Sequence, residues 1–361
     1  MTDERSLADV VDGAKIIVTT GTGGVGKTTT SAAIALHGAR SGRRTIVITI
    51  DPARRLADAM GISATANEPS RVDGPWAGEL YALMLDTKGT FDTLVTRYAT
   101  DETQCRRILE NGFYKNIAGA LSGTQEYMAM EKLHALAESE EYDLIVVDTP
   151  PTRHALAFLD APRLLTRLLE NRIYRLLMAP RGLVRAVNNA AHLFIRQITR
   201  IVGAEVVDDA IAFFRAFEGM EQGFTERAKT MIELLRSDDT AFVLVAAPRA
   251  DTVLETKYFV GQLAASHINV RACVVNRMAP VFGAVRAKAT KGLPHRQAVE
   301  RLRDAAVAEE AHVTDLIDGL GDIAIERVPM LASDLHDLEG IAAIEALLFG
   351  APTGRSGPPA K

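Results

Sequence analysis

Residues 15–36 limit what this chain can fold into more than any other segment. The apolar run Lys15–Thr20 predicts a buried strand, and Thr29–Leu36 predicts a helix. Between them lies Gly21–Thr28, with the sequence Gly-Thr-Gly-Gly-Val-Gly-Lys-Thr. Its glycines let successive backbone N–H groups surround a phosphate group, and the positive end of the following helix adds to the attraction. This order of elements favours a phosphate-binding P-loop over a glycine-rich turn that only closes a strand–helix unit.

The side chains that end the loop indicate which ligand it binds. Lys27 has the length to reach the β- and γ-phosphates of a nucleotide, and the hydroxyl of Thr28 suits a Mg²⁺ ion. The sequence therefore predicts a Mg²⁺–nucleotide site. Its candidate binding residues in the loop are Gly23, Gly24, Val25, Gly26, Lys27 and Thr28.

Short β-branched apolar runs recur along the chain between segments with helical spacing. The predicted strands are Ile16–Thr20, Thr45–Ile50, Leu80–Leu85, Asp143–Val147, Ala241–Ala246, Val270–Val275 and Ile323–Val328. Strands and helices that alternate on this scale predict an α/β fold, a P-loop NTPase with a mainly parallel sheet covered by helices on both faces. We expect this domain over residues 1–350 and a disordered Pro/Gly-rich tail over 351–361.

Two helical stretches interrupt the alternation, at about residues 90–138 and 154–236. Because both interrupt the order of the sheet, we expect them to pack together as an inserted helical subdomain. The second stretch carries many apolar residues at helical spacing, among them Leu164, Leu168 and Phe213. They form either an exposed groove for a hydrophobic client helix or the ordinary core of the subdomain, and the ordinary core is the favoured interpretation.

Two carboxylates follow predicted strands, where an open α/β sheet places its ligand. Asp51 is a candidate catalytic residue, with Lys27, because its carboxylate can orient or deprotonate an attacking water. Asp51 before Pro52 also suits a helix N-cap, and the P-loop in the same sheet favours the catalytic role. Asp148 ends an apolar strand in the Walker B pattern, so Thr28 and Asp148 are the candidate metal ligands.

The late strands supply candidates for the nucleotide base. Asn276 follows the predicted strand Val270–Val275, and its amide can both donate to and accept from the edge of adenine. The Asn-Lys-x-Asp guanine motif is absent, which favours ATP over GTP. Pro329, expected after the last strand, is a candidate for flanking the base.

Composition excludes several other classes. The formal net charge of −5 argues against a protein that coats nucleic acid. The two cysteines, Cys105 and Cys273, lie far apart, as in a reduced cytosolic protein. The charged N-terminus lacks the apolar region of a signal peptide, and no apolar run is long enough to span a membrane. We expect a cytoplasmic protein without an integral membrane segment, while peripheral membrane contact stays open.

Four motifs in this order resemble one family, the arsenite-pump and tail-anchored-protein-targeting ATPases. They are the Gly-Gly-x-Gly-Lys-Thr-Thr loop, an Asp-Pro-Ala segment at Asp51, an Asp-Thr-x-Pro-Thr-x-His segment from Asp148, and the pair Val275–Asn276. The resemblance runs from about residue 15 to 348. It implies a P-loop α/β domain with a helical subdomain, working as a nucleotide-gated dimer.

The resemblance also assigns roles to residues. It implies that Asp51 orients the lytic water, that Asn276 holds adenine, and that Thr28 and Asp148 hold Mg²⁺. The phosphates would be bound by Gly24, Gly26, Lys27, Thr28 and Thr29.

This chain departs from the family at two places. Members usually carry a lysine at the second loop position, reaching across the dimer to the partner's phosphates, where this chain has Thr22. The targeting branch also carries a Cys-x-x-Cys pair that clamps the dimer through zinc, and this pair is missing. The missing charge would come from Arg54 or Arg55 in the same site, or from a partner of the same family that carries the lysine. We favour the partner, in a heterodimer, although a homodimer remains an alternative.

The expected function is that of an Mg²⁺-dependent ATPase whose dimer presents a helical surface to a hydrophobic protein client. A partitioning or positioning ATPase of the same superclass is one alternative, but no basic amphipathic helix ends the chain. A small-molecule kinase is another, and it would need an acceptor pocket with basic lid residues. ATP turnover without an added acceptor separates the kinase from the two ATPases.

Overall fold

A computed structural model describes residues 6–50, 55–62, 67–117, 124–150, 203–216, 220–279, 293–331 and 337–350. The chain divides into two compact units. One holds residues 1–84, 136–156 and 235–361, and the other holds residues 85–135 and 157–234. Two of the boundaries, 135/136 and 234/235, fall inside helices α7 (Thr124–Ser139) and α13 (Glu221–Arg236).

The first unit is built on an eight-stranded sheet in the order β3-β4-β2-β5-β1-β6-β7-β8. Its strands are β1 (Ile16–Gly21), β2 (Arg44–Thr49), β3 (Ser70–Val72), β4 (Glu79–Met84), β5 (Leu144–Asp148), β6 (Thr240–Ala246), β7 (Val270–Met278) and β8 (Ala324–Pro329). All neighbours pair in parallel except β3, which pairs antiparallel with β4. The seven predicted strands are therefore confirmed, with small shifts at their ends. The unpredicted β3 is too short for its sequence to show a period.

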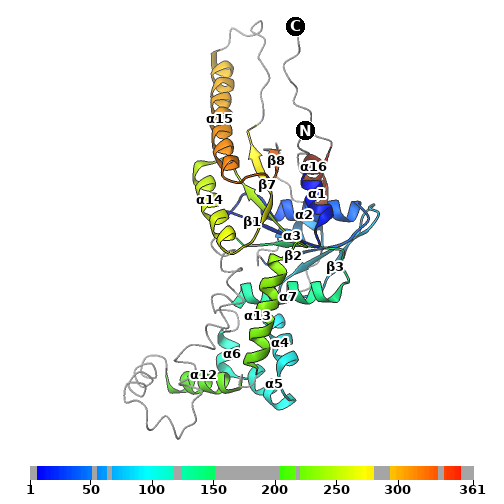
Figure 1. The fold of residues 1–361 in the computed structure, drawn as a ribbon, viewed down its shortest axis with the longest axis vertical. Helices are drawn as coiled ribbons and strands as arrows, with labels where there is room; N and C mark the ends of the chain where they lie inside the picture. The colour runs from blue at the N-terminus through cyan, green and yellow to red at the C-terminus, as the bar shows by residue number, and fades with distance from the viewer. Residues whose placement is uncertain are drawn as a thin grey trace. The chain divides into compact units, whose positions relative to one another are not determined.

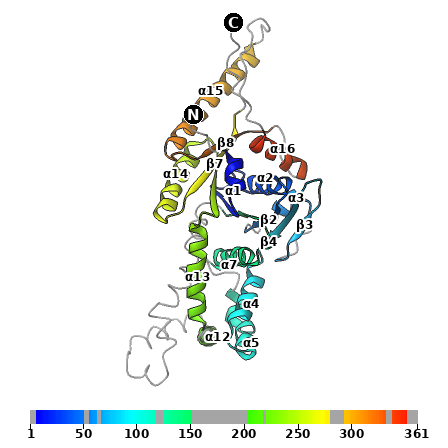
Figure 2. The ribbon, with the colours of Figure 1, turned by 45° about the vertical axis from the view of Figure 1, so that its right-hand side comes forward.

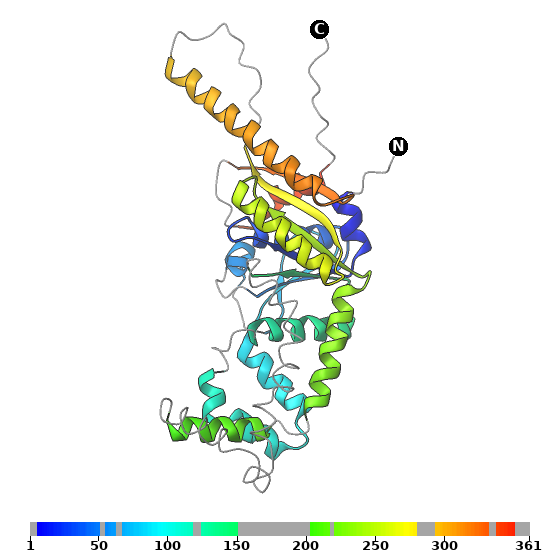
Figure 3. The ribbon, with the colours of Figure 1, turned by 60° about the vertical axis from the view of Figure 1, so that its left-hand side comes forward.

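Helices cover both faces of this sheet (Figures 1 and 3). They are α1 (Leu7–Gly13), α2 (Lys27–Arg40), α3 (Arg55–Met60), α14 (Ala250–Ala265), α15 (Leu293–Asp318) and α16 (Leu338–Phe349). Helices α1, α2 and α16 pack together, and α14 packs with α15. This is the α/β architecture of a P-loop NTPase, as predicted.

The core of the first unit lies between the sheet and α2. Every residue of β1 and β5 is buried, as is most of β2 and α2. Strands buried on both faces read as continuous apolar runs, which is why the sequence revealed them. Parallel pairing of β5 with β1 and with β2 places the carboxyl ends of these three strands side by side.

The second unit contains only helices in its described residues. They are α4 (Thr87–Tyr98), α5 (Glu102–Leu109), α6 (Gly112–Ile117), α12 (Ala204–Ala216), and the parts of α7 and α13 within its bounds. Figure 2 shows these helices from a second direction. In the described ranges of both units, no helix has the length and apolar character needed to cross a membrane.

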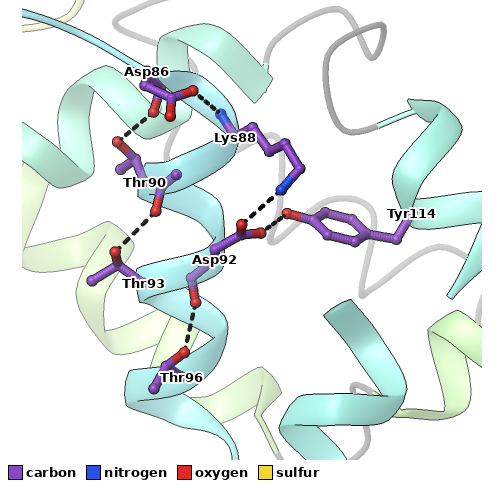
Figure 4. Close-up of polar contacts among 8 residues, drawn as sticks. Asp86, Lys88, Thr90, Asp92, Thr93, Thr96 and Tyr114 are labelled. Atoms are coloured by element: carbon purple, nitrogen blue, oxygen red, sulfur yellow. Dashed lines mark hydrogen bonds and ion pairs between the residues drawn. The ribbon is translucent and has the colours of Figure 1, made fainter. Parts of the chain in front are cut away.

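Local polar contacts explain where α4 begins and what holds it (Figure 4). Asp86 caps the helix by accepting a hydrogen bond from the backbone N–H of Lys88 at 3.0 Å. The Lys88 ammonium lies 2.8 Å from Asp92, and this contact raises the pKa of Lys88. The hydroxyl of Tyr114 on α6 donates to Asp92 as well. Burial, followed by this hydrogen bond, raises the pKa of Tyr114, so its hydroxyl remains a donor at neutral pH.

The second unit also buries an ion pair. Arg227 on α13 donates through Nη2 to Glu131 Oε1 at 2.8 Å and through Nε to Oε2 at 3.1 Å, and both side chains are 7% exposed. Tyr127, one turn before Glu131 on α7, is also buried. Its pKa is raised, mainly by burial and then by the charge of Glu131. The described part of this unit is therefore organised around a desolvated charge pair as well as apolar contacts.

We predict that Arg227→Met destabilises the protein by about 3–5 kcal/mol, because it leaves Glu131 buried without this partner. Chemical denaturation followed by circular dichroism measures the loss. Arg249→Met is the matched control, since its pair with Asp251 is exposed and should contribute about 0–1 kcal/mol. The double variant Arg227→Met/Glu131→Leu should recover much of the stability. Similar small losses for Arg227→Met and Arg249→Met would contradict the prediction.

Candidate functional site

The loop between β1 and α2 has the backbone conformation that its glycines allow. Gly24 and Gly26 adopt φ values of +76° and +99°, in the left-handed region that side chains disfavour. At Gly21 the limit is space, because a Cβ would lie 2.0 Å from the carbonyl oxygen of Val245. At Gly24, no described residue other than its chain neighbours has an atom within 4 Å of an added Cβ. Gly23 is exposed beside it.

Lys27 begins α2 and is nearly buried, with 7% of its surface exposed. Its ammonium donates to the carbonyl oxygen of Thr22 at 3.0 Å. The side chain therefore lies back along the loop, beside the backbone that is predicted to surround the phosphates. Thr29, in the first turn of α2, is half-buried.

Thr28 and Asp148, the two predicted metal ligands, lie in contact although 120 residues separate them. The Thr28 hydroxyl donates to Asp148 Oδ2 at 2.8 Å. Asp148 is the last residue of β5 and is 1% exposed. The register of β5 between β1 and β2 places it opposite Thr19 and Thr49.

Thr49 is a site residue that the sequence analysis missed. Its hydroxyl donates to the same oxygen, Asp148 Oδ2, at 3.0 Å. The sequence could have indicated this role, because Thr49 ends strand β2 only two residues before the candidate Asp51. Asp51 itself lies outside the described residues, so the structure gives no position for the proposed water-orienting carboxylate.

More hydroxyl groups hold the ends of these strands together. The hydroxyls of Thr19 and Ser31 lie 2.6 Å apart, which links β1 to α2. Thr149 donates through its hydroxyl to the carbonyl oxygen of Thr19 at 2.8 Å, which links β5 to β1. Since these groups are buried, each satisfied hydrogen bond helps to fix the geometry around Asp148.

Thr22, which stands where the family usually has lysine, is 3% exposed. Its hydroxyl is buried and has no hydrogen-bond partner among the described residues. The side chain therefore packs as a small group within the loop and offers no charge at this position.

Two predictions about the late strands need correction. Asn276 does not follow its strand, because β7 continues to Met278. Pro329 is the last residue of β8 rather than the first residue after it, and it pairs with Met278. In both cases the strand continues past the apolar run, because backbone pairing between neighbouring strands does not require apolar side chains.

Asn276 lies against the P-loop in this structure. Its amide Nδ2 donates to the carbonyl oxygen of Val25 at 2.8 Å. Val25 itself is buried in a small apolar cluster with Val245 and Ala247, at the end of β6 and just beyond it. The loop thus rests on the ends of both β6 and β7.

The residues present fit a nucleotide phosphate and a magnesium ion. Mg²⁺ prefers oxygen ligands, and it usually combines one or two protein groups with phosphate oxygens and water. Thr28 and Asp148 supply such oxygens, and Lys27 lies along the glycine-rich loop. In the described part of the chain, no group of three or more His, Cys, Asp or Glu residues forms a metal cluster. Cys273 is buried, which raises its pKa to about 12 and leaves it a neutral thiol.

Comparison with known proteins identifies the family. The model of the anion-transporting ATPases matches residues 14–350. The chain is 26% identical to ATPase ARSA2 of Chlamydomonas reinhardtii over 354 residues, covering 96% of this chain and 88% of that protein. It is 24% identical to ATPase GET3 of Malassezia globosa over 350 residues, covering 96% and 92%. It is 29% identical to an ATPase ASNA1 homolog of Dictyostelium discoideum over 283 residues, covering 76% of each.

The family match spans the P-loop, the Thr28–Asp148 contact and the strand that carries Asn276. The resemblance noted in the sequence is therefore confirmed over nearly the whole chain. The protein belongs to the anion-transporting ATPase family and is an ATPase.

Proposed function

We propose that this protein is an Mg²⁺-dependent ATPase that works as a nucleotide-gated dimer and presents a helical surface to a protein client. The observation that carries the Mg²⁺–ATP site is the hydrogen bond between Thr28 and Asp148, beside the glycine-rich loop and Lys27. It brings together the hydroxyl and the carboxylate that the two motifs assign to the metal. The client and the dimer rest on the family resemblance, and we infer a cytoplasmic location.

The chemistry at the site follows from these groups. Lys27 would move from the Thr22 carbonyl oxygen to the phosphates, where its charge stabilises the transferring phosphoryl group. Thr28 and Asp148 would hold Mg²⁺, which would neutralise part of the negative charge on the phosphates. Thr49 keeps the Asp148 carboxylate in place through a second hydrogen bond to Oδ2. Asp51 would orient the attacking water.

Recognition of the base is assigned to Asn276 and Pro329, at the ends of β7 and β8. A client surface is assigned to the helical unit. Several of the apolar residues predicted for it, such as Leu164 and Leu168, lie outside the described residues. Among those that the structure describes, Phe213 is buried and stacks on Tyr114 at 6.0 Å between ring centroids, and Met220 is buried as well. At these positions the apolar pattern serves the core, in line with the favoured interpretation.

Lys27→Ala tests the proposed site. The substitution removes a charge-assisted contact to phosphate, so ATP turnover should be largely abolished, and Mg²⁺–ATP should bind at least about tenfold more weakly. Lys15→Ala is the matched control, because Lys15 precedes β1 and pairs with exposed Asp239. Phosphate release and calorimetric titration provide the measurements. Turnover by Lys27→Ala at the parent rate would show that the nucleotide site is assigned wrongly.

Asp51→Asn tests the role of the water-orienting carboxylate. The variant keeps the shape of the side chain, so we expect ATP binding to persist while turnover falls by roughly 10²–10⁴-fold. The control is Asp337→Asn, since Asp337 caps α16 by accepting from Gly340 N, and either residue caps a helix well. Equal losses of binding and turnover in Asp51→Asn would instead support a role as a helix cap.

Thr22→Lys tests the proposal that a partner subunit supplies the missing charge. We expect the pure parent chain to bind ATP and hydrolyse it slowly, and Thr22→Lys to raise its turnover. Thr22→Val is the control, because it keeps the shape and removes only a hydroxyl without a hydrogen-bond partner in the described part of the chain. If the parent alone already turns over near about 1 s⁻¹ or faster, and Thr22→Lys adds nothing, the missing charge is unimportant.

A further inference from the structure

Asn276 contacts the P-loop at the peptide that joins Val25 to Gly26. Its Nδ2 donates to the Val25 carbonyl oxygen at 2.8 Å. The approach is close, since a Cβ on Gly26 would lie 2.2 Å from Nδ2. A side chain at position 26 would therefore displace this amide, and the φ of +99° already disfavours any residue but glycine there.

This contact sets the direction of a backbone N–H group. In a planar trans peptide, the carbonyl and the N–H point in opposite directions. Because the Val25 carbonyl points at Asn276, the N–H of Gly26 points away from it. Gly26 N–H is one of the groups that the P-loop motif assigns to phosphate. Holding the carbonyl therefore also holds this donor.

An irregularity in β7 aims the Asn276 side chain. The register between β7 and β8 shifts between Val275 and Met278. Arg277 has a φ of +63°, in the left-handed region. The backbone N–H of Arg277 donates to Asn276 Oδ1 at 2.9 Å, which fixes the rotation of the amide. A regular strand would give the side chain no such support from its own backbone.

The Asn276 amide has hydrogen-bonding groups left for a contact with the base. An asparagine side chain has two N–H donors and an oxygen with two lone pairs. One donor is directed to Val25 and one lone pair to Arg277. The other donor and lone pair suffice for an adenine edge, so bracing the loop and contacting the base are compatible.

We propose that Asn276 is a positioning residue for the P-loop, which orients the Val25–Gly26 peptide for phosphate before any nucleotide arrives. The inference rests on the proposed Mg²⁺–ATP site and adds a role to it. If it holds, part of the affinity contributed by Asn276 does not depend on the base.

The test is Asn276→Asp, with Mg²⁺–ATP and Mg²⁺–tripolyphosphate as separate ligands in calorimetric titrations. The carboxylate has the same shape, but it cannot donate to Val25 and repels its carbonyl oxygen. We expect tripolyphosphate to lose affinity by about tenfold or more, and ATP to lose at least as much, because its base contact with Asn276 is altered too. Asn111→Asp is the matched control, since Asn111 also donates to a carbonyl, that of Asp209, but in the helical unit. Its affinities should equal those of the parent.

A pH series separates positioning from general disruption. In the Asn276→Asp variant, protonation of the introduced carboxylate restores an O–H donor beside Val25. The ratio of parent to variant affinity should therefore narrow as the pH falls from about 8 toward 5. A ratio that stays constant would contradict the proposal. If Asn276→Asp does not fold, Asn276→Ala serves in the two-ligand test, because it also removes the donor.

The outcomes are distinct. A loss confined to ATP would overturn the inference and leave Asn276 as an adenine contact only. A parent chain that binds ATP but not tripolyphosphate would also overturn it, since a loop held ready must bind phosphates without the base. If neither ligand binds the parent, or if Lys27→Ala binds both as well as the parent does, the proposed site fails as a whole.

Discussion

The functional end of the sheet depends on one buried carboxylate, that of Asp148. It receives hydrogen bonds from Thr28 on α2 and Thr49 on β2, and its own strand lies between β1 and β2. A carboxylate that is 1% exposed has lost its hydrogen bonds to water, and hydroxyl donors at 2.8 and 3.0 Å replace part of them. The same requirement brings together the groups that would hold a metal ion. The hydrogen bonds that compensate for the burial of Asp148 thus also hold the groups of the proposed metal site together.

The P-loop is shaped mainly by backbone. Left-handed glycines at positions 24 and 26 form its turn, and the ends of β6 and β7 support it through Val25 and Asn276. A loop that binds phosphate through N–H groups needs those groups aimed before the ligand arrives, because reorientation would cost binding energy. The surrounding strand ends therefore contribute to the site even where they carry no charge.

The helical unit is stabilised by other kinds of interaction than the P-loop and the strand ends. Its described helices are held by the buried Arg227–Glu131 pair and by the stacked rings of Tyr114 and Phe213. A buried ion pair stabilises little relative to well-packed apolar residues, but removal of one partner is costly. Such a pair therefore favours one arrangement of α7 and α13 within this unit over alternatives.

The fold class and the motifs could be predicted from the amino-acid sequence alone. Strands buried on both faces appear as apolar runs, and the spacing of Gly24, Gly26 and Lys27 defines the loop, because both signals are local along the chain. The contacts between residues far apart in the chain became apparent only in the folded protein. Thr49 reaches Asp148 through strand register, Asn276 reaches Val25 through an irregularity in β7, and Pro329 extends β8 by pairing with Met278. These contacts depend on hydrogen bonds between segments far apart in the sequence. A local pattern of residues cannot predict such bonds.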